Sequence, residues 1–449
     1  MNSEPRTSVH GTWSGRWTFI LAAAGSAVGL GNIWKFPYMA GENGGGAFVL
    51  IYLICILLIG VPIMVAEILI GRRGRSSPAN SMEYLAKEAN TFPAWKLLGV
   101  MGAVAGLLIL SFYSVAAGWA VAYIFEGFNG TSANYYGESF DSFLQDETSL
   151  LFFHSIFILT TVAIVARGVI KGLEVWINRL MPILFIIVIL LCLYATQTGA
   201  FFEGVAYLFT PDFSKINGSI ILAALGQAFF TLSLGMGAIM AYGAYMPSKQ
   251  NIGSTAISVA FLDTSVALLA GMAIFPIVFA NDLQTASGPG LVFVTLPWAF
   301  VNMPLGLLFG KLFFILLSIA ALSSAISLLE PGVAWFVESF KTKRYVAAIG
   351  LGLIAWTLGI FSALSFGLLS DFTLVGDRNF FDSMDFLSNQ ILLPLGGIFI
   401  AIFVGWIMKK EKVLEELEIK NQLIIKVWFF FLKFIAPLTI IMIFVEGLT

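Results

Sequence analysis

The sequence contains 449 residues, of which 59% are hydrophobic and 11% are charged, and its mean hydropathy is +0.91. One water-soluble core cannot bury so much apolar surface, so the composition predicts a protein whose main partner is the lipid bilayer. The net charge of −2 and the scattered basic residues exclude a nucleic-acid partner, because too few cations are available to follow a phosphate backbone.

Eleven apolar stretches are long enough to cross a membrane, since a spanning helix needs about 20 residues. The alternating ten-residue segments of a membrane barrel are not found, so the expected fold class is all-α and polytopic. The whole chain, 1–449, is interpreted as a single transmembrane domain. The expected spans are 17–40, 44–70, 95–125, 149–168, 174–198, 218–246, 254–280, 309–340, 345–370, 386–408 and 427–446.

Basic residues are concentrated in the segments on one side of these spans. Examples are Arg6, Arg72, Arg73, Lys343 and Lys410. An excess of Lys and Arg marks the cytoplasmic side, so the amino terminus is expected in the cytoplasm. Eleven spans then place the carboxyl terminus outside, in a multi-pass protein of the cell's inner (plasma) membrane.

The first and sixth expected spans are interrupted by small and polar residues. The first contains "GSAVGLGNIWKFPY" (25–38), and the sixth contains "GQAFFTLSLGMGA" (226–238). Glycines at this spacing can serve close helix packing alone, but packing does not explain the polar residues. An unwound turn exposes carbonyl groups to a cation and amide groups to a carboxylate, so paired interruptions indicate a binding site.

A long apolar segment, "NDLQTASGPGLVFVTLPWAFVNMPLG" (281–306), separates spans seven and eight. It exceeds the length of a simple turn. Two interpretations remain: a lid that dips into the outer mouth, and a partly buried surface hairpin.

Five ordered motifs resemble the neurotransmitter:sodium symporter family across nearly the whole chain. Besides the two interrupted spans they are "ENGGGAF" (42–48), "AALSSAISLLEP" (320–331) and "FDSMDF" (381–386). The resemblance implies two inverted five-helix repeats, 17–198 and 218–408, with discontinuous first and sixth helices. Segment 427–446 is then an extra eleventh helix. It further implies a transporter that moves sodium and substrate together by alternating access.

The same resemblance implies two sodium sites. All of the matching groups are oxygen donors, as a hard cation requires. The first site matches Ala27, Asn32, Thr231 and Asp263, with the substrate carboxylate as a further ligand. The second matches carbonyls of Gly25, Val28 and Ala320 and hydroxyls of Ser323 and Ser324.

The implied substrate pocket is mostly apolar with one polar end. Its residues are Ser26, Ala27, Leu30, Gly31, Ile109, Tyr113, Phe230, Thr231, Ser233, Met236, Ser324 and Leu328. Amine-transporting relatives place an aspartate at the position of Gly29, so here the substrate must bring its own carboxylate. We therefore expect a neutral hydrophobic or aromatic L-amino acid, because Met236 and its apolar neighbours favour an uncharged side chain.

Asp263 stands where the family commonly has asparagine, and the matching chloride-site position four residues later is Ala267. A carboxylate inside the membrane needs a partner, and a bound cation is the natural one. Hydrogen bonding to neighbouring hydroxyls is the alternative. The substitution leads us to expect chloride-independent uptake.

The resemblance also implies two gates. Lys35 and Asp385 match the outer pair, although Lys35 could instead extend to the outer headgroups. Trp13 and Glu338 match the inner gate, but His10 occupies the place of the usual arginine, and Arg6 is the other cation available there. A histidine at this place makes a protonation-sensitive inner closure one expectation.

Rival functions are a proton-coupled transporter or exchanger with Asp263 as the proton carrier, and an amino acid sensor on the same fold. A membrane enzyme is not expected, because the sequence offers no nucleophile and base pair and its two histidines, His10 and His154, fit no metal or catalytic motif.

Overall fold

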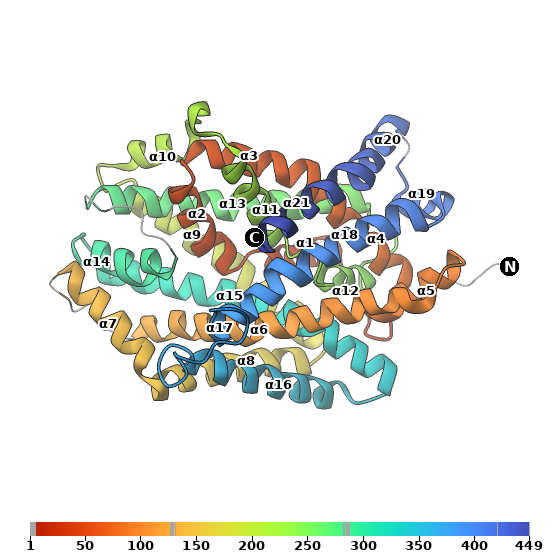
Figure 1. Cartoon of the computed structure of the whole chain (residues 1–449), viewed down its shortest axis with the longest axis horizontal. Helices are drawn as coiled ribbons and strands as arrows, with labels where there is room; N and C mark the ends of the chain where they lie inside the picture. The colour runs from red at the N-terminus through yellow and green to blue at the C-terminus, as the bar shows by residue number, and fades with distance from the viewer. Residues whose placement is uncertain are drawn as a thin grey trace.

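The computed structural model describes residues 6–125, 130, 132–281, 283, 288–419 and 421–448. The described residues are almost wholly helical, with long helices that run mostly along the longest axis of the molecule (Figure 1). Their only extended pairing is an isolated bridge between Val375 and Arg378. The all-α, polytopic fold class is therefore confirmed.

The first half of the chain forms the first five crossings and the segments that join them. The elements are α1 (Arg16–Ala27), η1 (Gly31–Lys35), α2 (Phe36–Glu42), α3 (Gly46–Cys55), η2 (Ile56–Gly60), α4 (Val61–Gly74), α5 (Pro78–Glu88), η3 (Pro93–Trp95), α6 (Lys96–Phe125), α7 (Ala133–Gln145), α8 (Glu147–Ala166), η4 (Val169–Glu174), α9 (Val175–Ala195), α10 (Phe201–Phe209) and η5 (Phe213–Lys215).

The second half contributes six more crossings. The elements are α11 (Gly218–Thr231), α12 (Ala238–Ala244), α13 (Ile252–Phe279), η6 (Leu291–Thr295), α14 (Leu296–Val301), α15 (Gly306–Phe340), α16 (Arg344–Leu364), α17 (Phe380–Asp385), η7 (Phe386–Leu392), α18 (Leu393–Ile402), η8 (Phe403–Ile407), α19 (Lys410–Leu417), α20 (Gln422–Phe430), η9 (Phe431–Ile435) and α21 (Ala436–Leu448).

Nine continuous helices in the described part are long and apolar enough to span a bilayer, and a bent pair forms a tenth crossing. The bent pair joins Arg16–Ala27 to Gly31–Glu42 at an angle of 56°. We count α11 and α12 together as the eleventh, because α11 is apolar but too short to span alone. The number of crossings agrees with the prediction.

The helix boundaries agree with the prediction to within five residues except at two places, where the difference is six residues. The tenth crossing begins at Phe380, six residues before the expected 386, because the Asn379 side chain caps it by accepting a hydrogen bond from Asp382 N (2.9 Å). The ninth crossing ends at Leu364, before the expected residue 370, and the chain continues as turns. A polar capping residue, rather than the first apolar residue, therefore sets the start of the tenth crossing.

The break in the first crossing lies between Ala27 and Gly31, as predicted. Val28 is extended (φ −69°, ψ 108°), so the helical hydrogen-bond ladder stops there. Side chains replace the missing partners: Gly29 N donates to Asn32 Oδ1 (3.0 Å), and Leu30 N donates to the Tyr113 hydroxyl (3.2 Å). An unwound turn within a membrane needs such partners, because no water is available in the hydrocarbon.

The break in the sixth crossing lies between Thr231 and Ala238. Ser233, Gly235 and Gly237 all have positive φ values (54°, 84° and 79°), which a helix cannot accommodate. Glycine adopts this conformation at little cost, whereas Ser233 needs support from its neighbours. Gly235 N donates to Glu67 Oε1 on α4 (2.7 Å), and the Ser233 hydroxyl donates to the Ser26 carbonyl (2.9 Å). The prediction of interrupted first and sixth helices is therefore confirmed.

The connecting helices lie at the two ends of the molecule (Figure 1). α5, α19 and the amino terminus lie at one end, and α7, α10 and α14 lie at the other. Between the ends, the long helices α6 and α15 cross closely at Gly106, where a Cβ atom would come within 2.5 Å of the Leu328 carbonyl oxygen. α15 also packs against α1 and α12 of the broken helices, and α12 packs mainly against α4.

Candidate substrate and cation site

A small cavity of about 30 Å³ lies among the two broken helices and the continuous helices α6 and α15. The residues that line it are Ser26, Ala27, Gly29, Gly31, Ile109, Tyr113, Phe230, Ser233, Met236, Ser324 and Leu328. Ten of the twelve predicted pocket residues are among them. Leu30 and Thr231 are not, although Leu30 contacts the Tyr113 hydroxyl and Thr231 contacts Asp263.

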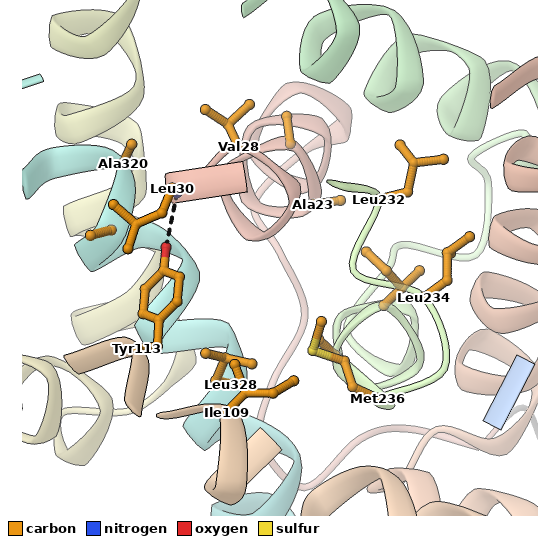
Figure 2. Close-up of a cluster of buried hydrophobic side chains, with 14 of the residues drawn as sticks. Ala23, Val28, Leu30, Ile109, Tyr113, Leu232, Leu234, Met236, Ala320 and Leu328 are labelled. Atoms are coloured by element: carbon orange, nitrogen blue, oxygen red, sulfur yellow. Dashed lines mark hydrogen bonds between the residues drawn. The ribbon is translucent and has the colours of Figure 1, made fainter. Parts of the chain in front are cut away.

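One end of the cavity is polar. The Tyr113 hydroxyl accepts a hydrogen bond from Leu30 N and still has its own proton to donate (Figure 2). A Cβ atom on Gly29 would lie 2.5 Å from Ser324 Oγ and 2.7 Å from the Tyr113 hydroxyl. A side chain at position 29 is therefore incompatible with this arrangement.

The rest of the cavity wall is apolar. Figure 2 shows the side chains of Ile109, Leu328 and Met236 gathered on the far side of Tyr113 from the Leu30 backbone. Phe230 lines this cavity and also a second, larger cavity on its outer side, which is described below. Such a wall favours an apolar side chain and offers no charge of its own.

Three of the residues predicted for the first sodium site form one hydrogen-bonded cluster. Asn32 Nδ2 donates to Asp263 Oδ1 (2.8 Å) and to the Asp263 carbonyl (3.0 Å), while the Thr231 hydroxyl donates to Asp263 Oδ2 (3.1 Å). Asp263 is fully buried, and within the described chain it forms no ion pair. Ala27, the fourth residue, lines the adjacent cavity. A buried carboxylate with only neutral partners is a strong ligand for a cation.

All five residues predicted for the second sodium site come together between α1 and α15. The Ser323 hydroxyl lies 3.0 Å from the Ala320 carbonyl and 3.4 Å from the Val28 carbonyl. The Ser324 hydroxyl lies 3.1 Å from the Val28 carbonyl and 3.5 Å from the Gly25 carbonyl. The oxygens are all neutral, a set that suits a monovalent hard cation. The described chain holds no cluster of three or more His, Cys, Asp or Glu residues arranged as metal ligands.

A second cavity, of about 260 Å³, lies on the outer side of the first, beside α17 and residues 288–289. Lys35 and Asp385 both line it, but the structure contains no ion pair between them. Lys35 Nζ instead lies 4.4 Å from the centre of the Phe230 ring, and Asp385 Oδ1 accepts a hydrogen bond from Asn389. The predicted outer gate residues therefore face a shared space without closing it.

Part of the 281–306 segment also faces this outer cavity. Gly288 and Pro289 line it, and the Gly288 carbonyl accepts a hydrogen bond from Trp34 Nε1 (2.9 Å). Phe293, in η6, is fully buried. The described part of the segment, which omits residues 282 and 284–287, fits the lid interpretation better than a surface hairpin.

The amino-terminal segment packs against α12 and α15. Trp13 is buried and donates from Nε1 to the Tyr242 carbonyl (3.2 Å). His10 Nε2 lies 3.1 Å from Glu338 Oε1, so His10 is the cationic-type side chain that contacts this carboxylate. Arg6 does not replace it, because the Arg6 guanidinium stacks over the Tyr84 ring (3.9 Å). Ser77 and Asn80 complete the hydrogen bonding of Glu338.

Two buried residues in the site were not predicted. Gln227 Nε2 donates to the Gly31 carbonyl (2.9 Å) and so supports the unwound turn of the first crossing. Ser327 accepts a hydrogen bond from Ser26 (2.8 Å). Both lie in motifs that we had singled out, and Ser327 follows Ser324 by three residues, the spacing that puts two side chains on one face of a helix.

Known proteins resemble this chain in sequence and in fold. A model of the sodium:neurotransmitter symporter family matches residues 10–148 and 139–449. The uncharacterized sodium-dependent transporter YhdH of Bacillus subtilis is 41% identical over 97% of this chain and 97% of its own. An uncharacterized sodium-dependent transporter of Methanocaldococcus jannaschii is 31% identical, over 94% of this chain and 87% of its own.

A solved structure shares both the sequence and the fold. The crystal structure of MhsT in complex with L-phenylalanine is 47% identical, with a TM-score of 0.88 over 97% of this chain and 99% of that chain. The family consists of secondary transporters rather than enzymes, which confirms the expectation that this protein is not an enzyme. The broken helices, the buried oxygen clusters and these similarities lead to one conclusion: the chain belongs to the sodium:neurotransmitter symporter family and is a sodium-dependent membrane transporter.

Proposed function

We propose that the protein takes up neutral hydrophobic or aromatic L-amino acids together with sodium, by alternating access and without chloride. The observation that carries this proposal is the small cavity, which has a polar end at Tyr113 and an apolar wall at Ile109, Met236 and Leu328. The likeness to MhsT, which was solved with L-phenylalanine, supports the same substrate class.

In the proposed complex, the substrate carboxylate lies at the polar end. Tyr113 donates its hydroxyl proton to the carboxylate, and the carboxylate also completes the first sodium site. The substrate ammonium faces the carbonyls of the interrupted helices. The substrate side chain packs against the apolar wall. A charge on that side chain would be desolvated there without a partner, at a cost of several kcal/mol.

Two sodium ions are proposed because the chain brings together two separate clusters of oxygen donors. The first consists of Ala27, Asn32, Thr231 and Asp263, and the second of Gly25, Val28, Ala320, Ser323 and Ser324. Asp263 gives the first site a fixed negative charge. Ala267, one turn further along α13, is buried and has no group that binds an anion, so we propose that the carboxylate takes the place of chloride.

The gates and the orientation are part of the proposal. Inner closure depends on Trp13, His10 and Glu338, whereas Lys35 and Asp385 approach each other when the outer cavity closes. The amino terminus is cytoplasmic and the carboxyl terminus extracytoplasmic in the inner membrane, because the basic residues cluster with the amino terminus. Residues 17–198 and 218–408 are the two inverted repeats, and 427–446 is the extra helix.

Uptake of radiolabelled phenylalanine into proteoliposomes tests the function. A sodium gradient should drive accumulation, replacement of sodium by choline should abolish it, and replacement of chloride by gluconate should leave it unchanged. Glutamate, lysine and phenethylamine should compete poorly, whereas leucine, tyrosine and tryptophan should compete well. Loss of uptake in gluconate would refute the chloride-independent part, and stronger competition by phenethylamine would refute the carboxylate requirement.

A second candidate is a proton-coupled transporter with Asp263 as the proton carrier. The observation that favours it is the complete burial of this carboxylate beside neutral hydrogen-bond donors. Accumulation driven by a pH gradient in sodium-free buffer would support this candidate. The sodium-coupled proposal predicts no accumulation under those conditions.

A further inference from the structure

Three serine side chains join the broken end of α1 to α15 in a closed circuit of hydrogen bonds. Ser26 Oγ donates to Ser327 Oγ (2.8 Å), and Ser327 Oγ donates to the Ser324 carbonyl (2.7 Å). Ser324 Oγ in turn lies 3.1 Å from the Ser26 carbonyl. All three residues are buried, so breaking one bond leaves a polar group without water to replace its partner.

The circuit contacts both proposed ligand sites. Ser26 lines the substrate cavity, and Ser324 both lines that cavity and belongs to the second sodium set. Ser327 neither lines the cavity nor belongs to a sodium set. It is therefore the member of the circuit that can be changed without removing a ligand of either the amino acid or the ion.

The Ser324 hydroxyl has one proton and three carbonyls within reach. These are the carbonyls of Ser26 (3.1 Å), Val28 (3.1 Å) and Gly25 (3.5 Å). A sodium ion bound to the Val28 and Gly25 carbonyls and to the Ser324 lone pair repels the hydroxyl proton. The Ser26 carbonyl, which is not in the sodium set, is then the acceptor that remains. Sodium binding therefore directs the Ser324 proton to Ser26 and strengthens the circuit.

The Ser26 carbonyl also connects to the second broken helix. It accepts a hydrogen bond from the Ser233 hydroxyl (2.9 Å), and Ser233 has a positive φ and lines the substrate cavity. A stronger bond from Ser324 to this carbonyl therefore holds Ser26 more firmly in place. Ser26 is hydrogen-bonded both to α15 and to Ser233 of the second broken helix, and residues of both line the cavity. Buried hydrogen-bond networks of this kind act together rather than pair by pair.

We propose that Ser327 is a positioning residue that couples the second sodium site to the substrate cavity. The inference rests on the proposed function, because it requires that sodium and an amino acid bind to these two sites. Ser327 acts through Ser26 and touches neither ligand. Its hydroxyl should therefore affect how strongly sodium raises amino acid affinity more than it affects that affinity itself.

The test is binding of radiolabelled L-phenylalanine to the purified full-length protein at low and at saturating sodium, with choline as the replacement cation. The Kd at low sodium divided by the Kd at saturating sodium measures the coupling between the two ligands. In Ser327→Ala we expect this ratio to fall by about fivefold, the effect of losing one buried neutral hydrogen bond. Ser318→Ala is the matched control, because Ser318 lies on the same helix and its hydroxyl bonds only the Phe314 carbonyl of α15 (2.8 Å).

A double-mutant cycle separates coupling from a structural role. In a Ser26→Ala background, the circuit is already open, so Ser327→Ala should not lower the ratio further. A Ser327→Ala ratio equal to that of the wild type, or an equal further loss in the Ser26→Ala background, would overturn the inference. If Ser327→Ala binds no phenylalanine, the test uses Ser327→Cys, which keeps the size of the side chain and a weak donor. A coupling ratio below that of the wild type supports the inference, and a ratio equal to that of the wild type overturns it.

Failure of the proposed function has a different signature. Wild-type protein that binds phenylalanine equally well in sodium and in choline would contradict sodium coupling itself. Wild-type protein with clear sodium coupling and an unaffected Ser327→Ala variant would contradict only the role of Ser327.

Discussion

Replacing Asp263 by asparagine should weaken sodium binding at the first site without removing an oxygen ligand. Asp263 is fully buried and its side chain has only Asn32 and Thr231 as hydrogen-bond partners, so little else screens its charge. A unit charge pair about 4 Å apart is worth about 4 kcal/mol at an effective dielectric constant of about 20. The amide dipole recovers part of this, and we expect a net loss of about 3 kcal/mol, or roughly a hundredfold in sodium affinity.

The assay is a sodium titration of phenylalanine binding to the purified Asp263→Asn variant. The midpoint of the titration should move to roughly a hundredfold higher sodium, while the maximum binding is retained at saturation. Asp212→Asn is the matched control, because Asp212 is an exposed carboxylate in the segment before η5. A midpoint within about twofold of the wild type would refute the reasoning that Asp263 binds the cation.

Three further outcomes follow from the contacts described above. Tyr113→Phe removes the hydroxyl that donates at the polar end and that accepts from Leu30 N. The affinity for phenylalanine at saturating sodium should therefore fall about tenfold or more. Unchanged affinity would show that the substrate carboxylate lies elsewhere. Met236→Ala removes part of the apolar wall of the cavity. In equilibrium binding, the affinity of this variant for phenylalanine should fall about tenfold, whereas its affinity for the substrate alanine should change little. Equal losses for both amino acids would argue against a contact between Met236 and the substrate side chain. Glu416→Gln weakens the ion pairs that dock α19 on Arg72 and Arg73, so the thermal unfolding midpoint in detergent should drop. The control is Glu411→Gln, an exposed carboxylate on the same helix, and equal midpoints would show that the Glu416 charge does not stabilise the docking of α19.

The broken helices could be predicted because their cause is local in the sequence. Gly235 and Gly237 adopt positive φ values, and the polar residues of "GSAVGLGNIWKFPY" supply partners for freed backbone groups. Asn32 is the clearest case, since its side chain caps the unwound turn only three residues away. Spacing along the chain carried this information, and the all-α fold class followed from the length and apolar composition of the spans.

Features that depend on residues far apart in the chain could not be predicted from spacing alone. Arg72 reaches Glu416, 344 positions later, and nothing in either segment indicates that α19 packs against the end of α4. The Lys35 ammonium lies over Phe230 rather than beside Asp385, and this choice of rotamer depends on the shape of the outer cavity. Ser327 was overlooked for a similar reason: its partner, Ser26, is 301 positions away.

A high-resolution structure determined in saturating sodium and L-phenylalanine tests the central claim most directly. The account predicts phenylalanine in the cavity lined by Ile109, Tyr113, Met236 and Leu328, with its carboxylate facing Tyr113 and a cation between that carboxylate and Asp263. Phenylalanine confined to the outer cavity beside Lys35, with Asp263 still bonded only to Asn32 and Thr231, would contradict it.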